Sequence, residues 1–169
     1  MGLDFVGVGG YKSYLTFLRF AEALKIPWVI FSDAETDNIK VSVQKQFSEC
    51  NSGKSESDCI IFLDDGYDFE YQLIKDGFND EIKKAIASFD VYTNEQHRAA
   101  AEPGRLAEIA KYDDKEIHKI ITGDKTKYAP AIAKQIIESG KDLPPKVIEL
   151  FGKIADVFKM QEAEHDGQG

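Results

Sequence analysis

Short apolar runs alternate with amphipathic stretches over the first 90 residues of the chain. Three apolar runs predict strands, at residues 3–8 (LDFVGV), 27–33 (PWVIFSD) and 59–65 (CIIFLDD). Between and after these runs apolar positions recur with helical period, at residues 14–26, 36–49, 68–77 and 79–89. An alternation of strands and helices along the chain is typical of parallel βαβ units. The pattern therefore predicts an α/β fold, with a parallel sheet flanked by helices on both faces.

After residue 90 the helical period continues and no further strand is predicted. Five helical segments are expected, at residues 93–101, 104–112, 114–122, 127–139 and 144–160. Expected boundaries lie at Pro103, Gly104, Gly140, Pro144 and Pro145. We therefore expect a single domain over residues 1–159, strand-rich in 1–90 and mostly helical in 91–159, followed by a polar, frayed tail over 160–169.

The amino-acid composition limits the classes of protein to which the chain can belong. A chain of 169 residues with 43% apolar content can bury one core of useful size. The net charge of −9 disfavours a protein that binds nucleic acid on its own, because such proteins use basic patches on phosphates. Clustered carboxylates can instead hold divalent cations, which invert the local field.

The two cysteines, Cys50 and Cys59, lack the spacing of a zinc site or a disulfide framework, which indicates a reduced, cytoplasmic setting. No apolar stretch approaches the roughly 18 residues of a membrane span, and the first residues do not resemble a signal peptide. We expect no membrane association.

The stretch GVGGYKSY, residues 7–14, resembles a phosphate-binding loop at first sight. A P-loop needs glycine immediately before its lysine, and here Tyr11 precedes Lys12 while Val6 occupies the position of the first required glycine. We interpret Gly9 and Gly10 instead as a tight turn before a helix, since glycine accepts positive φ without steric cost.

Acidic residues follow two of the predicted strands. Asp33 and Glu35 come after the second, and Asp68 and Glu70 come shortly after the third. Open parallel sheets bind ligands at the carboxyl ends of their strands. Residues i and i+2 of an extended segment point to the same side, so Asp33 and Glu35 are able to face one ion. Carboxylate oxygens are suitable ligands for Mg²⁺.

Spacing alone leaves other interpretations of these acids open. Asp and Glu also cap helices and favour the first helical turn, where they satisfy free amides and complement the helix dipole. Asp64 and Asp65 end the third predicted strand without an assigned role. A receiver-like signalling domain also gathers acids at strand ends, but it requires a fourth and a fifth strand after residue 90.

The order of these features resembles the C-terminal Toprim half of the OLD-family (overcoming lysogenization defect) ATP-dependent endonucleases. The resemblance covers the chain from about Leu3 to about Phe158. Its most specific elements are the two acidic pairs, together with a K-x-x-[YF]-A helix start at Lys125, Tyr128 and Ala129 and the following residues 143–145 (LPP).

The resemblance implies a function and a set of site residues. Asp33 and Glu35 match the D-x-D pair of Toprim domains, with Glu in place of the second Asp, and Asp68 and Glu70 match the second acidic pair. Together these four would hold two Mg²⁺ or Mn²⁺ ions. Lys125 matches a catalytic lysine near the scissile phosphate, although by position alone it is a surface lysine that opens a helix. The implied activity is two-metal hydrolysis of DNA.

The same resemblance implies partners for the chain. In this family an N-terminal ABC-type ATPase domain supplies ATP dependence, and homodimers are common. Toprim domains also carry a catalytic Glu at the end of a first strand, and no Glu precedes Phe5 here. We therefore expect a fragment of a larger nuclease with an incomplete metal site. The alternative is a catalytically silent, Toprim-like interaction or regulatory domain.

Overall fold

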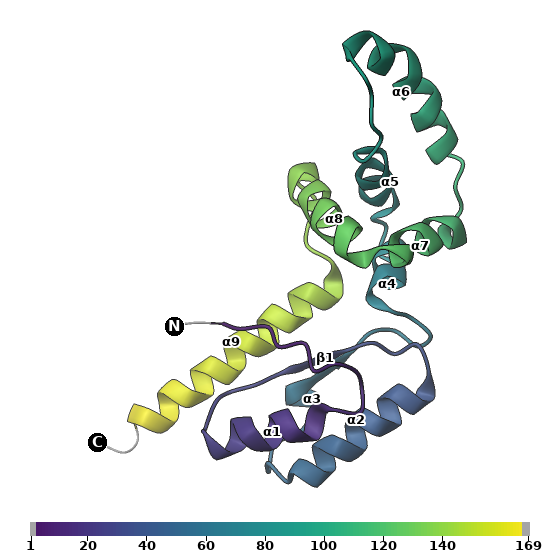
Figure 1. Ribbon diagram of the computed structural model, residues 1–169. Coiled ribbons are helices and arrows are strands. Elements are labelled where there is room, and N and C mark those ends of the chain that lie inside the picture. The colour runs from purple at the N-terminus through teal and green to yellow at the C-terminus, as the bar shows by residue number, and fades with distance from the viewer. Residues whose placement is uncertain (1–2, 167–169) are drawn as a thin grey trace. The chain divides into compact units, whose positions relative to one another are not determined.

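The computed structural model describes residues 3–166, and it describes the side chains of residues 3–159. Over this range the chain is mostly helical, with nine helices and one two-stranded parallel sheet (Figure 1). The chain forms two compact units. The first contains the residues up to Asp68 and those from Pro145 onward, and the second contains Phe69–Pro144. No helix within the described range is long and apolar enough to cross a membrane.

The first unit packs helices around the small sheet. Its elements are α1 (Tyr14–Ala23), β1 (Ile30–Ser32), α2 (Asp37–Cys50), α3 (Glu56–Cys59), β2 (Ile60–Phe62) and α9 (Pro145–Asp166). Its core contains Leu18 of α1, Val43 and Phe47 of α2, and Ile30 and Ile60 of the strands. The expected helices over 14–26 and 36–49 are therefore confirmed as α1 and α2, which contribute Leu18 and the pair Val43 and Phe47 to this core.

The sheet confirms two of the three predicted strands. β1 and β2 pair in parallel, with Ile30 opposite Ile60 and Ser32 opposite Phe62. Both strands are shorter than their apolar runs. Cys59, the first residue of the second run, belongs to the short helix α3, and β2 ends at Phe62. No strand follows β2 within residues 63–166, so the two late strands that a receiver-like domain requires are not found there.

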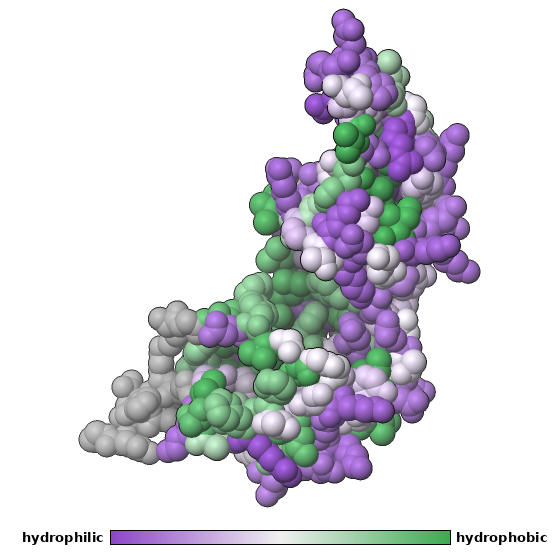
Figure 2. All heavy atoms as spheres, in the orientation of Figure 1, coloured by the Kyte–Doolittle hydropathy of each residue, from purple (hydrophilic) through white to green (hydrophobic). Residues whose placement is uncertain are grey.

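The strand predicted over residues 3–8 is wrong. This segment has no regular secondary structure, and Leu3, Phe5 and Val6 are exposed, Phe5 to 72%. An apolar run becomes a strand only where another strand pairs with its amides and carbonyls, and no pairing with this segment occurs in the described part of the chain. Hydrophobic surface on the first unit appears green in Figure 2, and exposed Phe17 and Phe20 of α1 add to the apolar surface of this unit.

The turn predicted at GVGGYKSY is present and is held by a glutamine of α2. Gly9 and Gly10 have φ of 73° and 122°, and the amide of Ser13 donates to the carbonyl of Gly10 at 3.1 Å. The buried side chain of Gln46 donates to the Tyr11 carbonyl at 2.7 Å and accepts from the Leu15 amide at 3.1 Å. Gln46 therefore satisfies one of the free amides at the start of α1, where Ser13 makes no side-chain cap.

We expect Gln46→Leu to lower the free energy of unfolding by about 1 to 3 kcal/mol, because it leaves two part-buried backbone groups without their partner. Trp28 is the single tryptophan and packs against the core of this unit, so its fluorescence during urea titration measures the change. Lys45→Ala, at an exposed position of the same helix, is the control. Equal midpoints for Gln46→Leu and the wild type would remove this role from Gln46.

The second unit is entirely helical. It contains α4 (Phe69–Lys75), α5 (Asn79–Ala87), α6 (Glu95–Ile109), α7 (Asp114–Gly123) and α8 (Lys125–Ser139). Its core is rich in isoleucine and includes Ile82, Ile109, Ile117, Ile121 and Ile132. The helices predicted on either side of Gly77 are confirmed as α4 and α5, and Gly77 adopts φ of 89° between them.

The helix boundary predicted at Pro103 and Gly104 is wrong. A single helix, α6, runs through both residues. Proline inside a helix removes one hydrogen bond and costs about 3 kcal/mol, so other contacts must support this helix. Asn94 caps its first turn by accepting from the His97 amide at 2.8 Å. Its last turn is tied to neighbouring segments through Arg105, as described below.

Candidate functional site

Buried and exposed side chains alternate where the chain leaves β1. Ser32 and Ala34 are buried, whereas Asp33 and Glu35 are exposed. The backbone of Ala34 is held from both sides, since its amide donates to the Tyr67 carbonyl at 3.0 Å and its carbonyl accepts from Gly66 at 2.8 Å. Asp33 and Glu35 are therefore presented on a fixed backbone, on the side opposite to Ala34.

The loop after β2 carries three aspartates in different environments. Asp64 lies 3.6 Å from the ammonium of Lys146, at the start of α9, and Asp65 forms an ion pair with Lys40 of α2. Asp68 is buried, with 5% of its surface exposed. The sequence did not identify Lys40 or Lys146 as partners of these acids. The only signal available was the position of Lys146 directly after the LPP motif, at the start of a predicted helix.

In the second unit, Glu70 and Lys125 are in direct contact. The Lys125 ammonium donates to Glu70 Oε2 at 2.7 Å. Glu70 lies in the first turn of α4, and its side chain is 15% exposed. Lys125 begins α8 directly after Asp124, whose side chain caps the helix by accepting from the Lys127 amide. The fold thus joins two predicted site residues that are 55 positions apart.

The described residues were searched for groups of side chains that could together hold a metal ion. Within the described residues, no group of three or more His, Cys, Asp or Glu side chains is placed to hold an ion. Mg²⁺ often binds through one or two carboxylates and keeps several waters. Asp33 and Glu35 offer two carboxylates for such binding, and both side chains are exposed to solvent.

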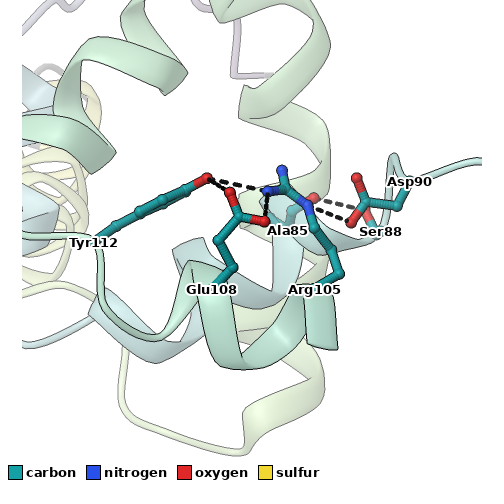
Figure 3. A network of polar contacts seen from close by, with 6 residues as sticks. All are labelled: Ala85, Ser88, Asp90, Arg105, Glu108 and Tyr112. Atoms are coloured by element: carbon teal, nitrogen blue, oxygen red, sulfur yellow. Dashed lines mark hydrogen bonds and ion pairs between the residues drawn. The ribbon is translucent and has the colours of Figure 1, made fainter. Parts of the chain in front are cut away.

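Arg105 forms the centre of a polar network in the second unit (Figure 3). Its Nε donates to Asp90 Oδ2 at 3.0 Å, and its Nη1 lies 3.0 Å from both the Tyr112 hydroxyl and Glu108 Oε2. The hydrogen bond with Tyr112 and those with Glu108 and Asp90 raise the pKa of the guanidinium. The hydrogen bond from Arg105, with that from Tyr112, lowers the pKa of the Glu108 carboxyl. The network ties the last turn of α6 to the segment after α5.

Comparisons of the chain with protein-family models, with curated proteins and with solved structures return no match. Any assignment of function therefore depends on the residues and contacts of the chain itself.

Proposed function

We propose that the chain is a Toprim-like nuclease module that hydrolyses DNA phosphodiester bonds with Mg²⁺ or Mn²⁺, and that it belongs to an ATP-dependent endonuclease of the OLD type. The observation that carries the proposal is the contact of Glu70 with Lys125 at 2.7 Å. Both residues were selected from motifs of the sequence, and neither motif predicts that they touch.

The arrangement of the first unit gives further support. β1 and β2 are adjacent and parallel, so the acids that follow them emerge at the same edge of the sheet. Asp33 and Glu35 would hold an ion there, with Asp68 and Glu70 as the second acidic pair of the proposal. When bound, the ions would polarise the phosphate and activate a water.

In this proposal Lys125 and Glu70, which form an ion pair in the second unit, each have a role. Lys125 places positive charge beside a phosphate that becomes more negative in the transition state. Glu70 orients the Lys125 ammonium, since a charge-assisted hydrogen bond fixes its direction. Part of the charge of Lys125 is thereby neutralised, so phosphate and Glu70 compete for the ammonium.

The test is nicking of supercoiled plasmid by the chain in Mn²⁺, in Mg²⁺ and in EDTA. We expect cleavage that needs the ion and that falls by about a hundredfold or more in Asp33→Asn, because the variant loses a carboxylate that would hold the ion, and with it the positive charge that stabilises the transition state. Asp58→Asn, at an exposed acid of α3 in the same unit, is the control for the change in charge. Cleavage that persists in EDTA, or that is equal in the two variants, would refute the proposal.

A catalytically silent, Toprim-like interaction or regulatory domain is the second candidate. The observation that favours it is the neutralisation of three acids by lysines, in the pairs Asp64 with Lys146, Asp65 with Lys40 and Glu70 with Lys125. Acids held in ion pairs are poorer ligands for a cation. This candidate predicts a folded chain that nicks no plasmid in either ion.

A further inference from the structure

Phe89, Lys127 and Tyr128 form an exposed cluster of one cation and two aromatic rings in the second unit, here called the aromatic cluster. The rings of Phe89 and Tyr128 meet edge to face, with centroids 5.4 Å apart. The Lys127 ammonium lies 4.5 Å from the centroid of Phe89 and 4.9 Å from that of Tyr128. Phe89 and Lys127 are exposed and Tyr128 is half-buried against the core.

The charge of Lys127 is not neutralised by a carboxylate within the described residues, although the chain as a whole is acidic. Its ammonium contacts ring faces instead, which is a weaker interaction than an ion pair in a partly buried setting. A phosphate near the cluster would therefore meet a lysine that has no competing carboxylate. Lys125, two positions earlier on α8, is paired with Glu70 and differs in this respect.

The backbone around Phe89 is fixed on both sides. The Ser88 hydroxyl donates to the Ala85 carbonyl at 2.7 Å, and Asp90 accepts from Arg105 at 3.0 Å (Figure 3). The amides of Phe89 and Asp90 donate to the carbonyls of Ile86 and Ala87. The backbone that carries the ring is thus held in place before any ligand arrives, which reduces the entropy lost on binding.

The charge of the chain is unevenly distributed between its parts. Residues 69–144 contain 12 basic and 14 acidic side chains, whereas the rest of the chain contains 9 basic and 16 acidic ones. Most of the acidic excess therefore lies outside the unit that carries the aromatic cluster. A polyanion is repelled less by this unit than the net charge of the chain suggests.

We propose that the aromatic cluster binds single-stranded DNA, with a base stacked on Phe89 and the adjoining phosphate at Lys127. Proteins that bind single strands combine ring faces with nearby cations in this way, because every base offers a face for stacking. Bases of duplex DNA are already stacked on one another, so the cluster selects an unpaired strand. The inference rests on the proposed function, since it names the form of DNA that the module holds.

Binding is measured by fluorescence anisotropy with a labelled oligothymidylate and with a duplex of the same length, in EDTA and low salt. We expect tighter binding of the single strand. Phe89→Leu should raise its Kd at least about fivefold, the lower end of what the loss of one stacked base costs. Ile137→Ala, at an exposed apolar position of α8 outside the cluster, should leave the Kd unchanged.

Lys127→Gln is compared with Lys134→Gln, which removes one exposed charge from the same helix. The salt dependence of binding, as the slope of log K against log salt, should weaken by about 0.7 in Lys127→Gln only, as expected for one lost phosphate contact on a single strand. Circular dichroism verifies that each variant is folded.

Three results would overturn the inference: no binding of the single strand by the wild type, equal or tighter binding of the duplex, or equal effects of Lys127→Gln and Lys134→Gln. Because EDTA removes the ions that cleavage needs, these results are independent of the nicking assay. Metal-dependent nicking without single-strand binding would contradict this inference alone.

Discussion

Lys125→Ala is expected to slow plasmid nicking by about 10²- to 10³-fold, the usual loss when one group that stabilises developing charge is removed from an active site. Glu70→Gln should slow it as well, because the Lys125 ammonium then loses the carboxylate that orients it at 2.7 Å. If the two side chains act as one unit, the double variant should be little worse than Lys125→Ala alone. The measurement is the initial rate of nicking at saturating Mn²⁺.

Lys134→Ala is the matched control for the loss of a lysine from α8. Its side chain is 70% exposed, and its ammonium lies 3.7 Å from Glu138, one turn along the same helix. It should change the rate less than about twofold, as exposed pairs of this kind contribute little. Unchanged cleavage in Lys125→Ala would remove this lysine from the mechanism, and additive losses in the double variant would mean that Glu70 acts independently of it.

Much of the first unit could be predicted because its elements depend on local patterns. The apolar runs at β1 and β2 and the helical periods of α1 and α2 each specify one buried face, and the core uses those faces. The segment over residues 3–8 has an equally apolar pattern and is not a strand, because pairing depends on a partner that the pattern does not reveal. Because the segment has no pairing partner, its Phe5 and Val6 are exposed.

The continuous helix α6 could not be predicted for a related reason. Pro103 and Gly104 are local signals to end a helix, and contacts from distant residues override them. Arg105 reaches Asp90, 15 positions earlier, and Tyr112, seven positions later, so both ends of the Arg105 network lie outside the helix. Residues outside the helix thus anchor its last turn, and local helix propensity does not include such contacts.

Strand ends and motifs identified the candidate acids, because the topology of parallel sheets brings such ends together. Of the lysines in contact with acids at these strand ends, the sequence indicated Lys125 beside the candidate Glu70, and it missed the partners of Asp64 and Asp65, to which no role was assigned. Lys40 and Lys146 come from α2 and α9, and pairing with Asp65 and Asp64 depends on how those helices pack. Sequence therefore specified which acids to examine, and packing decided which of them carry a counter-charge.

Lys141→Met is expected to lower the free energy of unfolding of the second unit by about 2 to 4 kcal/mol, because it leaves the buried Glu81 carboxylate without a counter-charge. The Glu81 side chain is 3% exposed, and the Lys141 ammonium lies 2.9 Å from its Oε2 and 3.2 Å from the Gly77 carbonyl. Methionine keeps most of the length of the lysine stem, so lost packing contributes little. The Lys141 side chain is 45% exposed, so solvent screens the ion pair. The loss of stability is therefore expected to be smaller than for a fully buried pair.

The double variant Glu81→Met, Lys141→Met separates the two possible causes of that loss. Removing both charges should recover most of the stability, since a buried ion pair can often be replaced by apolar residues at little cost. Urea titration followed by circular dichroism reports the helices of both units, whereas Trp28 fluorescence reports the first unit. A loss confined to the second unit should therefore change the dichroism transition and leave the fluorescence midpoint in place. Lys134→Met, at an exposed position of α8, should unfold like the wild type. A double variant as unstable as Lys141→Met would show that packing by the lysine stem, and not the charge of Glu81, holds the turn at Gly77.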